Sequence, residues 1–322
     1  MSYETAENQY LNWAETILNE GEGDDDRTGV GTIEYFGDPQ MKIDLRQEFP
    51  LLTTKKVSDH LIRTELVWML HGDTNLRYLA ENNNHIWDEW PFVSYLKNTG
   101  QEVPEQNSQE WSSKKSDYLK RIVADQAFAN TYGELGPVYG RQWRSWRGSD
   151  GETVDQLTNA QDQLRSGKSS RRVIVSAWNA GEIDEMAKSG LPPCHSLFQF
   201  NSSSTIDQET GKKYLDMKLY QRSGDWFLGV PFNMAQYALM LSAMAQTTDH
   251  TPRYFYHTFG NAHIYNNHVD QVKQQLGRRD QQFDAPQLNI NPEVKDIGEF
   301  EADDFEIVNY QHHPSIKAQV AI

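Results

Sequence analysis

The sequence predicts an α+β protein in which helices flank a substantial sheet. Residues 8–20 carry apolar side chains at helical spacing, from Tyr10 to Leu18, which predicts an amphipathic helix. Residues 214–222 alternate apolar and polar side chains, a pattern typical of a half-buried strand. The segment that Pro231 opens is apolar nearly all round as far as about residue 246, which predicts a buried helix.

The remaining elements are predicted from the same periodicities and from proline and glycine residues, which mark where helices and strands end. Ser58 can cap a helix that runs to about Leu70 and stops at Gly72. Residues 91–130 are rich in Gln, Glu, Asn, Ser and Lys, so we expect an inserted, solvent-facing subdomain there, with a short helix near 118–127. The other predicted segments are strand and turn at 33–52, a helix at 153–166, a buried strand at 172–178, strands at 197–200 and 253–258, and a last helix after 261–265.

The composition is that of a globular protein from a reducing compartment. The 322 residues are 37% hydrophobic and include one cysteine, so an internal disulfide is excluded. A formal net charge of −16 argues against broad binding to nucleic acid or to an anionic membrane. No apolar run has the length of a membrane span, and the first residues lack the pattern of a secretion signal. We therefore expect a cytoplasmic enzyme.

The single cysteine, Cys194, lies in the stretch Leu-Pro-Pro-Cys-His-Ser-Leu-Phe-Gln-Phe at residues 191–200. A lone cysteine is most often a small buried hydrophobic residue. This one follows two prolines, precedes His195 and leads into an apolar strand, which is also how a nucleophile would be held at the rigid mouth of a strand. From these residues alone, both interpretations stand.

Seven blocks follow one another along the chain. They are Asp-Arg-Thr-Gly from residue 26, His-Ile-Trp-Asp-Glu-Trp from 85, Gly-Pro-Val-Tyr-Gly-Arg-Gln-Trp-Arg from 136, Ser-Arg-Arg-Val-Ile-Val-Ser-Ala-Trp-Asn from 170, Leu-Pro-Pro-Cys-His from 191, Leu-Tyr-Gln-Arg-Ser-Gly-Asp-Trp-Phe-Leu-Gly-Val-Pro-Phe-Asn from 219 and Ile-Lys-Ala-Gln-Val-Ala-Ile from 316. In this order they resemble the folate-dependent thymidylate synthases, close to end to end. A lone Pro-Cys-His is a weak signal, whereas all seven blocks in order are specific. The segment at 91–130 is similar to an insertion that some bacterial members carry.

The resemblance implies one thymidylate synthase-like catalytic domain over residues 1–322, with the inserted subdomain at about 91–130. The implied fold is a large mixed or antiparallel sheet flanked by helices, and this sheet packs back to back with that of a second copy in a homodimer. The implied reaction is the reductive methylation of dUMP to dTMP. The co-substrate 5,10-methylenetetrahydrofolate would give both the carbon and the hydride and leave as dihydrofolate, with no metal involved.

For the chemical step, the resemblance assigns Cys194 as the nucleophile. Its thiolate would add to carbon 6 of uracil and so turn carbon 5 into a nucleophile. Arg222 would lie near the sulfur and favour the anion. Glu65 interrupts an apolar helix face, where a carboxyl holds its proton more tightly than in water, and the resemblance gives it a part in proton transfer. Tyr139 and His195 would belong to the same polar network, with His195 in a supporting role.

For dUMP, the resemblance assigns phosphate, ribose and base contacts. Asn233 would pair with O4 and N3–H of uracil, whereas the related dCMP hydroxymethylases carry aspartate at this position. Arginine suits the phosphate because its guanidinium presents several donors in a fixed geometry. The residues similar to the family's dUMP contacts are Arg27, Arg222 and Ser223 for the phosphate from one subunit, Arg171 and Arg172 for the phosphate from the partner subunit, His263 and Tyr265 for the ribose, and Gln221, Asp225 and Asn233.

For the folate, the resemblance implies a flat apolar surface with a few polar anchors. The C-terminal residues 320–322 are similar to the family's closing tail, which shuts over the co-substrate and excludes water. The residues similar to the family's folate contacts are Lys56, Ile86, Trp87, Trp90, Leu191, Asp225, Leu228, Gly229, Phe232 and Ala321.

Several positions depart from the family pattern, among them Ser58 and Asp59, which vary the region after Lys55 and Lys56, and three positions near the predicted site. Asn261 stands where aspartate is more usual, and we expect weaker orientation of His263. Trp226 replaces a small aliphatic residue beside Asp225, where a large ring would reshape the folate pocket. Gln319 replaces a proline of the tail, so the closing segment should lose rigidity.

Three other functions fit some of these residues. A dUMP hydroxymethylase of the same fold would use the same thiol but let water capture the one-carbon unit; Trp87 and the tail argue against it. A non-catalytic regulator would be expected to lose the thiol or the arginines, and both are present. A thiol hydrolase is disfavoured because Cys194 and His195 are adjacent in sequence, which is poor geometry for a catalytic triad.

Overall fold

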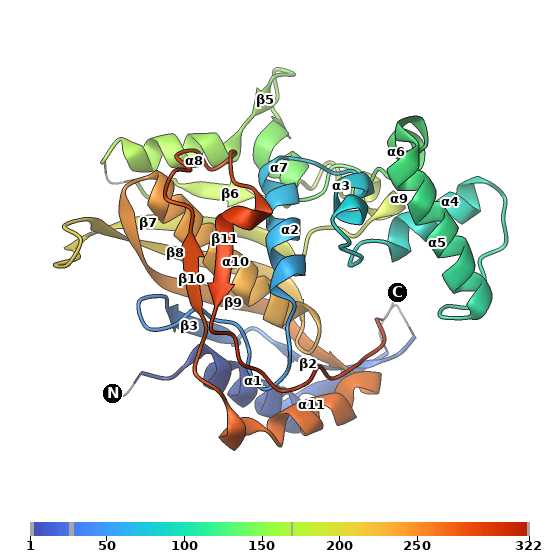
Figure 1. Ribbon diagram of the computed structural model, residues 1–322, viewed down its shortest axis with the longest axis horizontal. Helices are drawn as coiled ribbons and strands as arrows, with labels where there is room; N and C mark the ends of the chain where they lie inside the picture. The colour runs from blue at the N-terminus through green and yellow to red at the C-terminus, as the bar shows by residue number, and fades with distance from the viewer. Residues whose placement is uncertain (1–2, 26–28, 169, 321–322) are drawn as a thin grey trace. The chain divides into compact units, whose positions relative to one another are not determined.

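A computed structural model of the protein describes residues 3–25, 29–168 and 170–320. The chain divides into two units, of which unit 1 is formed by Met1–Arg63, Leu157–Val175 and Cys194–Ala321 and unit 2 by Thr64–Gln156 and Ser176–Pro193. The predicted α+β class with a large mixed sheet is confirmed (Figure 1). Within the described residues, no helix is both long enough and apolar enough to cross a membrane.

Unit 1 is organised around a mixed sheet, to which the described residues contribute seven strands in the order β1-β2-β9-β8-β7-β6, with β3 also paired to β9. Strands β8 and β9 run parallel, and such a pair needs a crossover connection, which helix α10 (Gly229–Thr247) supplies. The pairs β1–β2, β2–β9, β3–β9 and β7–β8 are antiparallel. The strands are β1 (Glu22–Asp24), β2 (Thr32–Phe36), β3 (Gln40–Asp44), β6 (Ile174–Ser176), β7 (His195–Ile206), β8 (Lys213–Asp225) and β9 (His250–Tyr265).

Helices cover this sheet and bury its apolar side chains. Helix α10 lies against β8 and β9, and α1 (Ala6–Glu20) lies against β2, β3 and β9 and beside α11 (Figure 1). The predicted buried helix is confirmed, although α10 begins at Gly229 and accommodates Pro231 within its first turn. The other elements of this part are α2 (Asp59–Leu70), which continues into unit 2, α8 (Gln156–Arg165), η1 (Asn266–His268), α11 (Val269–Leu276), η2 (Arg279–Gln281), β10 (Gln287–Ile290), η3 (Ala302–Asp304) and β11 (Phe305–Val308).

Strand β9 is much longer than the sequence predicts, because it has two partners in succession. Strand β3 pairs with residues 254–258 and β2 with residues 261–265, so the segment expected to leave the strand remains in the ladder. Between them, a Cβ on Gly260 would lie 2.7 Å from Tyr220 Oη and 2.9 Å from Arg222 O. Glycine is therefore required by the close approach of β8.

The predicted buried strand at 172–178 is wrong in length and in burial. Strand β6 covers only Ile174–Ser176, and its successive side chains alternate between exposed and buried positions. Val173 and Val175 are buried, whereas Ile174 is 45% exposed. A short strand at the edge of a sheet keeps one face in solvent, which the apolar sequence alone does not reveal.

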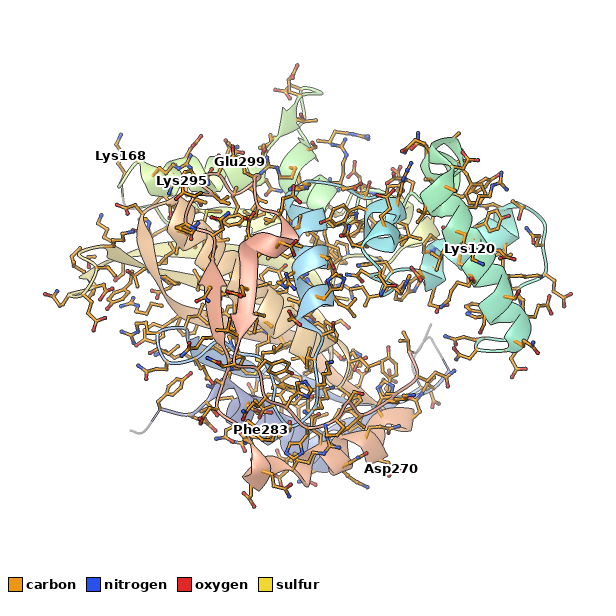
Figure 2. All side chains as sticks on the ribbon, in the orientation of Figure 1. Lys120, Lys168, Asp270, Phe283, Lys295 and Glu299 are labelled. Carbon is orange, nitrogen blue, oxygen red and sulfur yellow. The ribbon has the colours of Figure 1, made fainter. Side chains whose placement is uncertain are left out.

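The segment predicted to be an insertion contains a cluster of buried aromatic side chains, so it is not solvent-facing throughout. Phe92, Trp111, Tyr118 and Phe128 are at most 4% exposed, and Trp111 meets Phe92 edge to face at 5.1 Å. Its polar residues lie on the outer side of the helices, as Lys120 on α5 shows (Figure 2). The elements of unit 2 are α3 (Leu76–Glu81), α4 (Glu89–Asn98), α5 (Gln109–Ala124), α6 (Gln126–Tyr132), α7 (Gly140–Ser145), β4 (Trp146–Arg147), β5 (Thr153–Val154) and α9 (Ile183–Ser189).

Two predicted helix boundaries are corrected by capping and pairing. In place of one helix near 118–127, α5 begins after Ser108, whose hydroxyl accepts from Trp111 N at 3.1 Å. Asp125 then takes an extended conformation and caps α6 by accepting from Phe128 N at 3.0 Å. The helix predicted at 153–166 starts at Gln156, because Thr153–Val154 pairs with β4.

Trp226 lies in the core of unit 1 and does not reshape a surface pocket. Its ring is fully buried and stacks on Tyr10 of α1 at a centroid distance of 5.6 Å. Trp226 Nε1 donates to Tyr10 O at 3.1 Å, and Tyr10 Oη donates to Trp226 O at 2.9 Å. The expectation for this residue is thus wrong, because its side chain fastens α1 to the sheet.

Trp226→Val should therefore act on stability. We expect the free energy of unfolding to fall by about 3 kcal/mol, since the substitution opens a large cavity and removes a buried hydrogen bond. Urea denaturation measures this change. Phe36→Val is the control, because Phe36 is 78% exposed and its loss should change stability by less than about 0.5 kcal/mol. Equal effects of the two substitutions would contradict the prediction.

Candidate active site

Cys194 immediately precedes β7, where that strand begins its pairing with β8. The register sets His195 opposite Gln221, and Arg222 N donates to Cys194 O at 2.8 Å. This backbone contact brings Arg222 Nη2 to 3.9 Å from Cys194 Sγ. The cysteine is partly exposed, so the cation favours the thiolate at an accessible sulfur, as in reactive cysteines.

His195 is a neutral residue beside the thiol. Burial lowers the pKa of its imidazole to about 4, helped by the charge of Arg222 and opposed by a hydrogen bond with Asn233. Its ring meets Tyr237 edge to face at 5.2 Å. An uncharged, packed imidazole suits the supporting role that the sequence suggests.

Asn233 stands on the first turns of α10, next to the end of β8. Its Oδ1 accepts from Gln221 Nε2 at 3.0 Å, and the same Nε2 donates to Ser223 O at 3.0 Å. A Cβ on Gly229 would lie 3.6 Å from Asn233 Oδ1 and 3.7 Å from Asp225 Cβ. Asn233, Gly229 and Asp225 are therefore close neighbours, as expected of residues that share a binding site.

His263 and Tyr265 end strand β9. His263 Nδ1 is 3.0 Å from Asn261 Oδ1, and Asn261 in turn donates to Glu34. Asn261 was expected to weaken the orientation of His263, but its amide makes the orienting hydrogen bond that an aspartate would make. The Tyr265 ring meets His263 edge to face at 5.2 Å, so both predicted ribose contacts come from one end of the strand.

The predicted phosphate contacts that the structure describes fall into two groups. Arg222 and Ser223 are partly buried at the end of β8, close to the thiol. Arg171 and Arg172 precede β6 and are exposed in the single chain, where Arg171 O accepts from Gln199 Nε2 at 3.0 Å. Arg27 lies outside the described residues, as does Ala321, which was predicted to contact the folate.

Unit 2 holds the predicted residue Glu65 and, near its buried carboxyl, the rings of Trp87, Trp90 and Tyr139. Glu65 on α2 is 6% exposed and accepts from Trp87 Nε1 at 2.7 Å. The Trp87 ring contacts Trp90 at 5.7 Å and Tyr139 at 6.0 Å. Tyr139 has a positive φ of 21°, a costly conformation for this residue type, at the start of α7. The predicted residues Ile86 and Leu191 are both partly buried in the same unit.

The comparison with known protein families assigns this chain. The family described as thymidylate synthase matches residues 8–322, nearly the whole chain. The protein belongs to the thymidylate synthase family. This confirms the resemblance drawn from the seven blocks. The family implies a methyltransferase that uses methylenetetrahydrofolate, and its members are typically dimeric and bind dUMP.

A family member needs anchors near the folate surface, and here the structure draws attention to a lysine that sequence reasoning missed. Lys56, the predicted contact, is exposed, whereas Lys55 is 6% exposed. Lys55 Nζ donates to Phe227 O and lies 3.6 Å from the centre of the Phe227 ring. It thus supports the turn that Asp225 forms by accepting from Phe227 N and Leu228 N, each at 3.0 Å. In the structure Lys55 continues the buried run Leu51–Thr54, whereas the sequence gives no signal that separates Lys55 from Lys56.

The C-terminal segment is held along unit 1 despite the loss of proline at position 319. Gln319 O accepts from His268 Nε2 at 2.8 Å, and Pro314 O accepts from Arg278 Nη1 at 2.9 Å. Tyr310 Oη donates to Leu52 O at 2.7 Å. Backbone carbonyls make most of these contacts, so the substitution leaves the anchoring of the segment intact.

The buried lysine makes stability depend on pH. Burial lowers the pKa of Lys55 from 10.5 to about 7, so between these values the unfolded chain binds a proton that the folded chain does not. Stability then rises with pH, and we expect wild type to gain about 1 kcal/mol per pH unit relative to Lys55→Met between pH 7.5 and 9.5. Urea denaturation at several pH values measures this difference.

Lys56→Met is the matched control. Lys56 is exposed, so its removal should leave a constant difference in unfolding free energy over the same range. A difference between wild type and Lys55→Met that does not change with pH would show that Lys55 stays charged in the fold.

Proposed function

We propose that the protein is a thymidylate synthase that converts dUMP to dTMP by reductive methylation, with 5,10-methylenetetrahydrofolate as co-substrate. The observation that carries the proposal is the Cys194 sulfur held 3.9 Å from the Arg222 guanidinium. In a chain of this family, such a pair supports covalent catalysis on the pyrimidine ring.

Cys194 supplies the covalent step. Its thiolate forms a bond to carbon 6 of uracil, and the electron pair of the ring double bond moves to carbon 5 and O4 as an enolate. Arg222 stabilises the thiolate before this addition. Carbon 5 can then bond the incoming one-carbon unit and lose its proton, and the bond from that carbon to the folate nitrogen breaks to leave a methylene group on carbon 5. When the hydride reaches this methylene group, the thiolate leaves carbon 6 and the ring double bond returns. Two easier steps replace a direct attack by a poor carbon nucleophile.

Glu65 is the proposed carrier of protons for this sequence. Its carboxyl is 6% exposed and is oriented by the indole N–H of Trp87. A carboxyl that a hydrogen bond holds in one position can act as a general acid or base. Tyr139 packs against the same indole and is proposed to belong to this polar group.

The start of α10 fits a flat ring system. Leu228 and Phe232 are partly exposed and apolar, and Gly229 leaves open the space next to Asn233 that a side chain would fill. The bound folate supplies one carbon and the hydride that reduces it. The anchored C-terminal segment supports exclusion of water, and therefore reduction in preference to dUMP hydroxymethylation.

A homodimer is the proposed assembly. Leu197 and Tyr220 are paired across β7 and β8, and each is 38% exposed on the same face of the sheet. Exposed apolar side chains in register on a sheet are typical of a surface that packs against another protein. Arg171 and Arg172, exposed at the edge strand, would then complete the partner's phosphate site.

Product analysis tests the reaction. With dUMP and 5,10-methylenetetrahydrofolate, mass spectrometry should find dTMP and dihydrofolate. Cys194→Ser should lower kcat by at least about a thousandfold, because a hydroxyl is a far weaker nucleophile than a thiolate. Calorimetry should show that the variant still binds dUMP.

Two other results would replace the proposal. Hydroxymethyl-dUMP with tetrahydrofolate would identify the hydroxymethylase and show that water reaches the one-carbon unit. Binding of dUMP without any product would identify a non-catalytic binding protein.

Subunit mixing tests the origin of the arginines. Cys194→Ser and the double variant Arg171→Ala/Arg172→Ala should each be inactive alone. Mixed after reversible dissociation, they should regain about a quarter of wild-type activity, because half of the dimers are hybrids and each hybrid has one complete site. Mixing that restores nothing, although hybrids form, would show that both arginines act within their own subunit.

A further inference from the structure

A buried polar chain connects β9 to the side chain proposed to read the base. His257 Nε2 lies 2.8 Å from Gln221 Oε1, and Gln221 Nε2 donates to Asn233 Oδ1 at 3.0 Å. His257 is fully buried, and Gln221 is 2% exposed. Neither is exposed enough to exchange these bonds for bonds to water, so the polarity of the chain is fixed by the protein.

The direction of every bond in the chain follows from one backbone carbonyl. Ser223 O can only accept, so the group of Gln221 that faces it at 3.0 Å must be the NH₂. The other hydrogen of this NH₂ points to Asn233, and Oε1 is left to face His257. His257 must then carry its proton on Nε2 and donate it to Gln221.

The surroundings of His257 support this tautomer. Burial lowers the pKa of the imidazole well below its usual value, so the ring is neutral. Its Nδ1 has no hydrogen-bond partner among the described residues, as suits the nitrogen that bears no proton. The ring packs between the rings of Phe259 and Phe255, with distances between ring centres of 4.1 Å and 5.3 Å, and this packing leaves it little freedom to turn.

We infer that His257 is a specificity-determining positioning residue, which acts through Gln221 to fix the amide of Asn233 for uracil and against cytosine. With Oδ1 held by Gln221, Asn233 presents its NH₂ as a donor, which O4 of uracil accepts. Cytosine carries an amino group at that position and calls for an acceptor. Turning the Asn233 amide to supply one would set its NH₂ against the NH₂ of Gln221. Gln221 is kept from turning with it, because it would then set its oxygen against Ser223 O and lose the bond from His257.

This inference rests on the proposed function, because it takes Asn233 as the residue that reads the base. It adds a residue two strand positions before Phe259 that would not itself touch the nucleotide. His195 also has a hydrogen bond with Asn233, but it is the residue next to Cys194 in the sequence and bonds Asn233 directly. His257 acts on Asn233 only through Gln221.

The test compares binding of dUMP and dCMP by isothermal titration calorimetry. His257→Phe and His257→Leu fill the space of the imidazole with an apolar side chain and remove the N–H donor. Each should lower the ratio of the Kd for dCMP to the Kd for dUMP at least about tenfold. His257→Gln returns an N–H near the same position and should recover most of the preference. The kcat with dUMP should change by a smaller factor than the ratio of the two dissociation constants, because the substitutions leave the thiol and Arg222 in place.

Coupling to Gln221 distinguishes a relay from a loss of packing. Gln221→Leu should narrow the preference as His257→Phe does, and the double variant should be no worse than Gln221→Leu alone. Phe200→Leu is the control for buried volume in the same sheet: it should lower the unfolding temperature and leave the preference unchanged.

Three results would overturn parts of this account. A full preference for dUMP in folded His257→Phe or His257→Leu would remove His257 from base reading. Additive losses in the double variant would show that it does not act through Gln221. Wild-type protein that binds neither nucleotide would overturn the proposed function itself.

Discussion

The antiparallel pairing of β7 with β8 is the constraint on which the rest of the site depends. The bond from Arg222 N to Cys194 O is part of this pairing, so the thiol and the guanidinium are neighbours through the backbone and not only through mobile side chains. Strand β8 also pairs in parallel with β9, which sets Gln221 opposite Phe259 and Asp225 opposite His263. The crossover between these strands is α10, whose first turns carry Asn233. One strand thus positions the proposed nucleophile, base reader and ribose contact relative to one another.

The side chains of Gln221, Asn233 and His257 bond one another at this sheet. An unpaired buried amide or imidazole is costly, whereas a connected network is rigid and has a defined polarity. His195 and His257 are both buried and neutral, so neither brings a charge into the core. Aromatic rings pack against this network. The centre of the Phe259 ring lies 4.1 Å from the centre of the His257 ring and 5.0 Å from that of Trp226. A Cβ on Gly224 would come within 2.9 Å of the Phe259 ring, so the large rings and this glycine fit together.

A second constraint holds the segments around the start of α10. The buried carboxylate of Glu7 accepts from the backbone N–H and hydroxyl groups of Thr53 and Thr54, at 2.7 to 3.0 Å. Charge-assisted bonds of this kind are strong, so they fix the segment that carries Lys55 beneath the turn at 225–228. The C-terminal chain bonds the same segment through Tyr310. Glu7 is thus one of the carboxyl groups that this acidic protein keeps inside, where it anchors the segment that carries Lys55.

The sequence by itself determined the elements whose signal is local. Periodicity located the helix at 8–20, the strand at 214–222 and the buried helix from Pro231, because side-chain spacing reports the period and burial of a segment directly. The motif order identified the family and with it Cys194, Arg222 and Asn233 as candidates. Tertiary structure alone decided that β9 continues to Tyr265, that Lys55 and not Lys56 is buried, that Trp226 packs on α1, and that His257 bonds Gln221. Each of these features depends on a contact with a residue that is distant in the sequence. The spacing of side chains within one segment does not specify that distant residue.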